Sequence, residues 1–266
     1  MGDNFLLSQN LLLIGLEVLA LLVVAAFVGY RLGWRHSTLD GSEKRERVAG
    51  TTAGAMLALV GFMLAVSLSM ADSHFQVRRK LILDEANAIG TSRLRAVTIG
   101  GAHGSEIVRL LREYAQLRLE YFTAGEDAAR LQSVDQRTSS LQQRIWAHAS
   151  TIANAAPTPV SALLLSTLNE TFDLATARRW ALEVRVPPYV IGLLLALSAL
   201  AMGLMGYYFG ASGVRYPLLS GVLFVAFTVT ILLVMDLNRP RAGLISAEQS
   251  ALMWTIEEMG QPPSNP

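Results

Sequence analysis

Four long runs of apolar residues alternate with polar stretches along the chain. They cover residues 11–30, 51–71, 189–209 and 218–235, and Glu17 is the only charged residue within them. Each run is close to the ~20 residues that a helix needs to cross a hydrocarbon core of about 30 Å. The pattern therefore predicts four transmembrane helices. The first run is too long for a cleaved signal peptide, and the residues before it lack the Lys or Arg that such a peptide carries.

The second run passes into a stretch that also has helical character. No proline occurs before Pro157, and Gly100-Gly101 is the first strong stop signal. We therefore expect one helix that runs from about Gly50 past Arg95. At 1.5 Å per residue, such a helix extends well beyond the bilayer.

The segment between the second and third runs is expected to be helical throughout. Apolar residues recur at helical spacing along three stretches, 107–121, 131–152 and 164–175, which is typical of helices that bury one face. The expected boundary residues are Ser105 as a cap, Gly125 as a stop, and Thr158-Pro159 as the start of the last helix. These stripes predict a helical bundle outside the lipid.

The alternation of apolar and polar stretches divides the chain into four parts. They are two spans with a short charged loop (1–72), a helical soluble domain that continues from the second span (73–186), two further spans (187–237) and a carboxyl-terminal part (238–266). In the last part, Ser246 and Gln249 form an S-x-x-Q capping box before an amphipathic helix over residues 247–259. That helix docks on the bundle or lies on the membrane surface. The expected fold is an all-α integral membrane protein with four transmembrane helices.

Composition supports this fold and narrows the chemistry. The chain is 52% hydrophobic and only 16% charged, whereas soluble domains have about 25% charged residues. Its net charge of +1 argues against a nucleic-acid partner. It has no cysteine, which excludes disulfides, thiol catalysis and thiolate metal sites. Lys and Arg near the span ends nearly balance between the two sides, so they do not indicate the orientation in the membrane.

Sequence motifs of enzymes and of metal sites are missing. The chain has no G-x-x-x-x-G-K, H-E-x-x-H or G-x-S-x-G motif. The histidines lack metal-ligand spacing and are expected to be solvated or interfacial; they are His36, His74, His103 and His148. We therefore expect no enzymatic activity, no cofactor and no metal centre.

Small residues and one carboxylate mark special positions within the spans. In the second span, small residues recur at Gly50, Gly54, Ala58, Gly61, Ala65 and Ser69, and in the third at Gly192, Ala196, Ala199, Gly203, Gly206 and Gly210. Such faces let helices approach closely in lipid, either inside one subunit or, for the second span, around a pore or an oligomer axis. Glu17 is expected to face a partner or a wet cavity unless it lies near the membrane surface. Its candidate partners are Thr51, Thr52, Ser67, Ser69 or an amino group of another helix.

The stretch DEANAIGTSRLRA, residues 84–96, places an amide and a glycine on an apolar helix face. That face carries Leu83, Asn87, Gly90, Leu94 and Val97. A buried amide needs a hydrogen-bond partner, and glycine is tolerated best where another helix crosses closely. We expect a buried crossing inside one subunit or, alternatively, a contact that sets subunit register or gating. Other faces carry charged residues that can pair with neighbouring helices, among them Asp84, Glu85 and Arg93.

Charged residues also lie at the ends of the spans. Arg78, Arg79 and Lys80 follow the second span and are expected to contact lipid headgroups or to attract anions to a pore mouth. After the fourth span, Asp236 can pair with Arg239 three residues later. The residues that then break the helix are Pro240 and Gly243.

Two of these segments resemble a known family. The segment E-A-N-A-I-G-T and the segment D-L-x-R-P-x-x-G are similar to those of the bacterial bestrophin-like membrane proteins, over roughly residues 45–255. The family name implies kinship with bestrophins, which are pentameric anion channels with four spans per subunit, a cytosolic helical part and a pore lined by the second membrane helix. No proline corresponding to the bestrophin neck occurs in residues 51–71, and no acidic cluster resembles the bestrophin calcium clasp.

The resemblance implies a homo-oligomeric, passive channel for small inorganic anions in the plasma membrane of a bacterium, in contact with its lipids. By that analogy, the pore-lining candidates are Leu57, Gly61, Leu64 and Leu68, with the leucines as apolar constrictions. The alternative is a membrane-anchored signalling or scaffolding protein whose helical middle domain binds a partner or ligand. A third hypothesis is a transporter or a component of an energy-coupled motor, in which Glu17 carries the proton.

Overall fold

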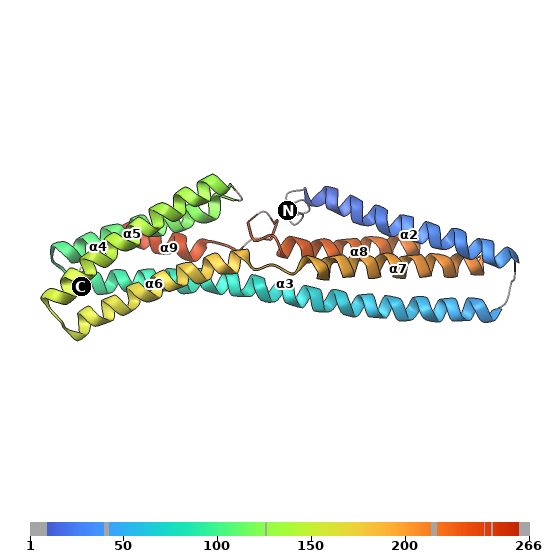
Figure 1. Cartoon of the computed structure of the whole chain (residues 1–266), viewed down its shortest axis with the longest axis horizontal. Helices are drawn as coiled ribbons and strands as arrows, with labels where there is room; N and C mark the ends of the chain where they lie inside the picture. The colour runs from blue at the N-terminus through green and yellow to red at the C-terminus, as the bar shows by residue number, and fades with distance from the viewer. Residues whose placement is uncertain are drawn as a thin grey trace. The chain divides into compact units, whose positions relative to one another are not determined.

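A computed structural model describes residues 10–39, 43–125, 127–213, 217–241, 243–245 and 247–260. Within these ranges the secondary structure is helical and no strand occurs. In chain order the helices are α2 Leu11–Leu39, α3 Glu43–Ile99, α4 Gly101–Thr123, α5 Ala128–Ala155, α6 Pro159–Glu183, α7 Pro188–Ser212, α8 Pro217–Leu237 and α9 Ser250–Gly260 (Figure 1). The all-α prediction is therefore confirmed.

Four helical segments are long and apolar enough to cross a membrane. They are Leu11–Ser37, Glu46–Ile99, Pro159–Ser212 and Ser220–Leu237. The third includes both α6 and α7, and its apolar run lies in α7. The four predicted spans are thus confirmed by helix length and composition.

The second span continues as one helix, as the sequence predicted. α3 is unbroken from Glu43 to Ile99 and ends where Gly100 and Gly101 adopt φ values of 67° and 66°. Residues with a side chain rarely adopt these angles, so the glycine pair turns the chain within two residues. The prediction that Ser105 caps the next helix was wrong, because α4 restarts at Gly101 directly after this turn.

Other helix ends follow the local chemistry of the sequence. Gly125, with a φ of 62°, follows the end of α4 as predicted, and the Asp127 side chain caps α5 by accepting from two backbone N–H groups. Thr158 caps α6 in a capping box with Ser161. The predicted cap Ser246 lies outside the described residues, and α9 begins at Ser250, three residues later than predicted.

The chain forms two compact units. Unit 1 comprises Met1–Ser73 and Arg185–Arg239, and unit 2 comprises His74–Val184 and Pro240–Pro266. The core of unit 1 lies among α2, α3, α7 and α8; its buried residues are Ile14, Val18, Leu22, Val60, Leu64, Leu194, Ala201, Met202, Ile231 and Met235.

Glycines allow α2 and α7 to pack closely inside unit 1. A Cβ atom added to Gly206 of α7 would lie 2.0 Å from the Ala26 carbonyl oxygen, and one added to Gly29 of α2 would lie 1.9 Å from that of Gly203. These backbones touch directly, which is how helices gain packing energy in lipid. The third span's small face is therefore used for packing within the subunit at Gly206, whereas Gly192 on the same helix has nothing within 4 Å.

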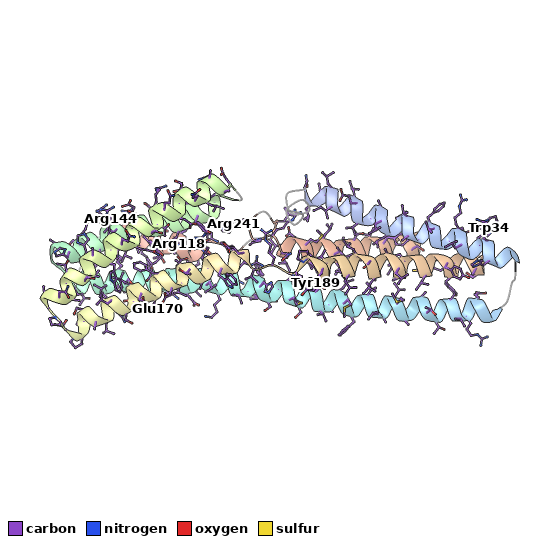
Figure 2. The ribbon with its side chains drawn as sticks, in the orientation of Figure 1. Trp34, Arg118, Arg144, Glu170, Tyr189 and Arg241 are labelled. Carbon is purple, nitrogen blue, oxygen red and sulfur yellow. The ribbon has the colours of Figure 1, made fainter. Side chains whose placement is uncertain are left out.

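Exposed aromatic residues mark the two ends of the unit 1 helices. Tyr189 lies near the start of α7 and Trp34 near the end of α2, and both side chains are exposed (Figure 2). Trp34 is level with Gly210, since its backbone nitrogen would lie 2.8 Å from a Cβ at that glycine. Tyr189 and Gly210 are about 32 Å apart along α7 at 1.5 Å per residue, close to the hydrocarbon thickness. This spacing matches the aromatic belts of membrane proteins.

Unit 2 is a helical bundle with a single apolar core. The carboxyl-terminal part of α3 contributes Ile89, and α4, α5 and α6 contribute Leu110, Ile145 and Leu168. Leu252 of α9 packs into the same core. In this unit α9 is therefore docked on the bundle, which is one of the two placements that the sequence allowed.

Candidate functional site

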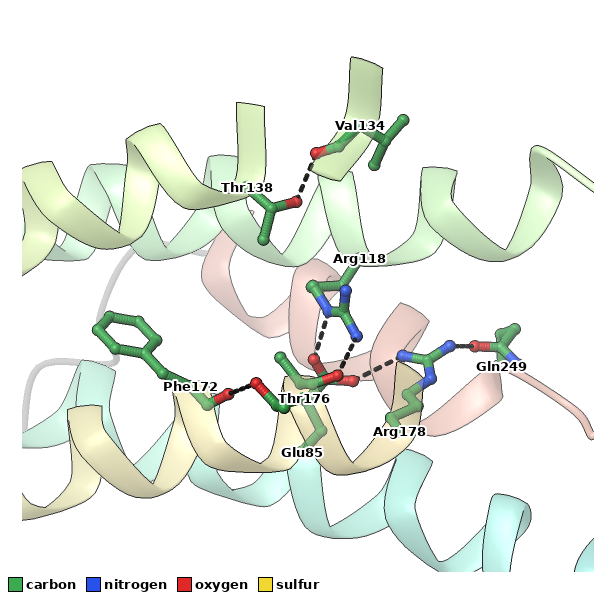
Figure 3. A network of polar contacts seen from close by, with 9 residues as sticks. Glu85, Arg118, Val134, Thr138, Phe172, Thr176, Arg178 and Gln249 are labelled. Carbon is green, nitrogen blue, oxygen red and sulfur yellow. Dashed lines mark hydrogen bonds and ion pairs between the residues drawn. The ribbon is translucent and has the colours of Figure 1, made fainter. Parts of the chain in front are cut away.

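A buried cluster of charged side chains lies in the core of unit 2. Glu85 of α3 is 0% exposed and lies on the same helix face as Ile82 and Ile89. Its carboxylate accepts from Nε of Arg118 on α4 at 2.5 Å and from a guanidinium nitrogen of Arg178 on α6 at 2.7 Å. Figure 3 shows the two arginines reaching the Glu85 carboxylate from two different helices.

Each arginine makes one further hydrogen bond. Arg118 donates to the Ala175 carbonyl oxygen of α6 at 3.3 Å. Arg178 donates to the side-chain oxygen of Gln249, the residue that precedes α9 (Figure 3). The cluster therefore ties α3, α4, α6 and the segment leading to α9 together in the middle of an apolar core.

Electrostatics keep Glu85 ionised in this position. Burial alone would raise the pKa of the carboxyl, but the charges and hydrogen bonds of Arg118 and Arg178 outweigh burial and lower its pKa. Arginine stays protonated in proteins, so one carboxylate faces two cations and the cluster carries a net positive charge. Each member therefore depends on the others, because a lone buried charge is costly.

We expect the stabilising effect of Glu85 to depend on pH. The pKa of Glu85 is lower in the folded protein than in the unfolded chain. Its contribution to the free energy of unfolding is therefore fully present above the pKa in the unfolded chain, about 4.3, and is lost as the pH falls through the pKa in the folded protein. The difference in thermal stability between wild type and Glu85→Gln should therefore be constant above about pH 5 and shrink below about pH 4. Thermal unfolding in detergent across this range measures it, and a difference unchanged down to pH 3 would contradict the assignment.

The sequence indicated only part of this cluster. It placed Glu85 on a face that can pair with other helices, which is confirmed by the two arginines. It did not predict Arg118 or Arg178 as members, and it gave Gln249 the role of a helix cap instead of a partner of Arg178. A signal was present for the first, because Arg118 falls between Tyr114 and Tyr121 in a stripe of otherwise apolar residues.

The face of α3 that carries Asn87 is exposed in unit 2. Leu83, Leu94 and Val97 are 50%, 60% and 47% exposed, and Asn87 is exposed as well. Among the described residues nothing lies within 4 Å of a Cβ added at Gly90. The prediction of a buried crossing inside one subunit was therefore wrong. The opposite face fills the core, because Ile82, Glu85 and Ile89 point inward.

The neighbouring charged residues of α3 have distinct surroundings. Asp84 pairs with Lys80 of the preceding turn at 2.6 Å. Arg78 is buried and donates from Nε to the His74 carbonyl oxygen, so it is not available to lipid headgroups or anions. Arg79 is exposed. The Nε of Arg93 is buried and has no hydrogen-bond partner among the described residues.

In unit 1, the exposed surface of α3 divides into two faces by helical periodicity. One carries small residues, namely Gly54, Ala58, Gly61, Ala65 and Ser69, and the other carries large apolar residues, namely Leu59, Phe62, Val66 and Met70. Nothing in the described chain lies within 4 Å of a Cβ added at Gly54 or Gly61. The small face is thus free for water or for another copy.

The predicted pore leucines do not share the small face. Leu64 is only 7% exposed and fills the core of unit 1 beside Val60. Leu57 and Leu68 are half-buried. Of the four candidates, Gly61 alone lies on the fully exposed small face, because the positions 57, 64 and 68 rotate towards the core.

Glu17 of α2 is exposed. Two of its expected partners, Thr51 and Thr52, donate instead to the carbonyl oxygens of Arg47 and Val48 in their own helix. Such bonds satisfy hydroxyls inside apolar helices without a second helix.

The end of the fourth span is buried and held by an asparagine. Asp236 and Arg239 are each 4% exposed, and the Arg239 N–H donates to the Asp236 carbonyl oxygen at 2.9 Å. Between them, the Asn238 side chain accepts from the Val186 N–H at 2.6 Å and donates to the Val186 carbonyl oxygen at 3.5 Å. Asn238 therefore fixes the segment that leads into α7, a role that the sequence did not predict. Pro240, which cannot donate a backbone hydrogen bond, and Gly243 follow outside the helix.

The chain is similar to one protein family over most of its length. The sequence profile of the Bestrophin-like domain matches residues 18–252, whereas no curated protein matches the chain. A solved structure of a bacterial Bestrophin homolog from Klebsiella pneumoniae is similar with a TM-score of 0.65 at 16% identity, over 96% of this chain and 100% of that one.

Two single-residue variants of a bacterial Bestrophin homolog from the same organism have the same fold. Their TM-scores are 0.66 and 0.67, each at 16% identity, over 95% and 94% of this chain and 100% and 97% of theirs. At this identity the likeness concerns the fold.

Proposed function

Because this chain belongs to the Bestrophin-like domain family, we propose that it forms a homo-oligomeric, passive channel for small inorganic anions in the plasma membrane of a bacterium. The observation that carries the proposal is the exposed small-residue face of α3 in unit 1. A membrane helix rarely needs an unpacked face of Gly, Ala and Ser towards lipid, because such residues gain little from contact with acyl chains. They are useful where helices approach an axis.

In the proposed assembly, α3 helices of several copies surround a conduit. The small face, which includes Gly54 and Gly61, borders the water, and the large face, with Phe62 and Val66, contacts lipid or a neighbouring copy. Leu57 and Leu68, at the margin of the small face, are the candidates for apolar constrictions that gate by dewetting. Leu64 is left out, because it fills the core of its own subunit.

The exposed stripe of α3 in unit 2 supports contacts between copies. Leu83, Leu94 and Val97 offer an apolar seam, and Asn87 lies within it. A single polar residue in such a seam selects one register, because only one alignment gives the amide a hydrogen-bond partner. Arg79, exposed beyond the end of the apolar run, is the basic residue that remains available to draw anions.

Because the chain has no cysteine, a single cysteine substitution tests which face of α3 borders the pore without any reaction of native thiols. Purified protein in planar bilayers is expected to conduct chloride in preference to potassium. Gly61→Cys should conduct and then lose most of its current when a charged, water-soluble thiol reagent is added, since the modified side chain blocks the conduit. The matched control is Val66→Cys on the large face, whose current should persist.

Two outcomes would overturn the proposal. One is the absence of current from an intact wild-type oligomer over a wide range of voltages. The other is block of Val66→Cys by the reagent while Gly61→Cys is unaffected, because this would place the large face of α3 at the water.

A membrane-anchored scaffold is the second candidate function. The exposed seam around Leu94 in unit 2 favours it, since the same surface suits a different protein as well as another copy. A stoichiometric partner that co-purifies with wild type and is lost in Leu94→Glu would support this function. Loss of the homo-oligomer in that variant would support the channel.

A further inference from the structure

Two histidines from different helices of unit 2 meet at its surface. His103 lies in the first turn of α4, and His148 lies near the end of α5. Their Nδ1 atoms are 2.8 Å apart, and their ring centroids are 5.1 Å apart. The two helices run antiparallel, as the pair Glu120 and Arg137 near their other ends shows, so residues 45 positions apart become neighbours.

The sequence did not predict this pair. It treated the histidines as scattered because metal-ligand spacing was sought along the chain. The pairing needs the length of both helices and their antiparallel packing, neither of which is visible at either residue alone.

The carboxylate of Glu106 lies within electrostatic reach of His148. Glu106 follows His103 by three residues on α4, so both lie on one side of the helix. Its oxygens accept from Arg109 at 2.6 and 2.8 Å and lie 3.7 Å from Arg144 of α5. The hydrogen bonds from Arg109 lower the pKa of Glu106, so it is ionised at neutral pH. Arg109 also pairs with Glu113 at 3.5 Å. Two carboxylates thus balance the two guanidinium groups, so the surroundings do not strongly repel a cation.

We propose that His103 and His148 bind one divalent transition-metal cation of the zinc class and thereby clamp α4 to α5. Neutral imidazole is a preferred ligand for such ions, and both rings can present Nδ1 to one centre. Zinc–nitrogen bonds of about 2.0–2.1 Å in a tetrahedron hold two nitrogens about 3.3 Å apart. The rings therefore need to separate by about 0.5 Å from their present distance, a small movement for the exposed His103.

The remaining coordination positions belong to water or to Glu106. Within the described residues, no group of three or more His, Cys, Asp or Glu side chains has metal-binding geometry. The site therefore supplies two protein ligands as it stands, and Glu106 becomes a third only if its carboxylate gives up its hydrogen bonds from Arg109. Hard cations such as Mg²⁺ prefer oxygen ligands, so they should not bind here.

Calorimetry with zinc chloride tests the site in the full-length protein. The protein must carry no polyhistidine tag and the buffer no chelator. We expect one ion per chain and a rise in the thermal unfolding midpoint, because binding to the folded state stabilises it. Loss of one imidazole, in His103→Ala or His148→Ala, should weaken binding by about 100-fold or more, the advantage of two linked ligands over one.

Controls keep the result specific to the pair. Ser105→Ala and Gln143→Ala remove exposed polar side chains from the same two helices and should bind zinc like wild type. Magnesium chloride should have no effect. The proposal is overturned if wild type binds no zinc, or if the double variant His103→Ala/His148→Ala binds it as well as wild type.

Discussion

Replacing Glu85 by Ala is expected to destabilise unit 2 by about 3–5 kcal/mol, the cost of leaving buried partners of an ion pair uncompensated. Arg118 and Arg178 would then both be buried in the core without the carboxylate that now pairs with them. For a unit of this size the midpoint of thermal unfolding should fall by about 6–20 °C. Thermal unfolding of the purified protein in detergent, monitored by the size-exclusion profile of the soluble fraction, measures the effect.

The adjacent residue provides the matched control. Asp84→Asn removes a carboxylate one position away, but the lost pair with Lys80 is exposed and should cost about 0–1 kcal/mol. If Glu85→Ala does not fold, Glu85→Gln keeps the shape of the side chain and should give a smaller loss of the same sign. Equal effects of Asp84→Asn and Glu85→Gln would contradict the central role of Glu85.

A triple variant separates charge from packing. Replacing Glu85, Arg118 and Arg178 together by Met removes all three charges and keeps long side chains in the core. Buried ion clusters of this kind can be exchanged for apolar residues with little loss, so the triple variant should be more stable than Glu85→Ala. If the triple variant is less stable than Glu85→Ala, then the ion pairs themselves stabilise the fold and do more than neutralise one another's buried charges.

The sequence predicted what depends on local chemistry and on periodicity. The end of α3 at Gly100-Gly101 and the cap of α6 at Thr158 follow from residues within a few positions of each boundary. The spans follow from the length of their apolar runs. Ser105 shows the limit of this reasoning, because a good capping residue is not used when the preceding turn already restarts the helix.

The sequence did not predict which of two faces of α3 packs against the other helices of unit 2. The stripe with Asn87 and the stripe with Glu85 both lie on α3, and hydrophobicity favoured the first as the buried one. The structure buries the second, because Arg118 and Arg178 compensate the charge of Glu85. Their positions 33 and 93 residues away along the chain are fixed only by how α4 and α6 pack against α3.

Replacing glycine by alanine in α7 should have opposite effects on stability at a covered and at an uncovered position of the helix. Gly206→Ala would place a Cβ atom 2.0 Å from the Ala26 carbonyl oxygen, a backbone atom that cannot move without shifting α2. We expect a loss of about 3 kcal/mol or more in the free energy of unfolding, at the upper end of the cost of overpacking.

At Gly192, an added Cβ atom meets nothing within 4 Å, so Gly192→Ala should stabilise α7 by up to about 1 kcal/mol through helix propensity. Thermal unfolding of both variants in the same detergent measures the difference in sign. A stable Gly206→Ala would mean that α2 and α7 are further apart in the protein, and the close seam that holds unit 1 together would have to be abandoned.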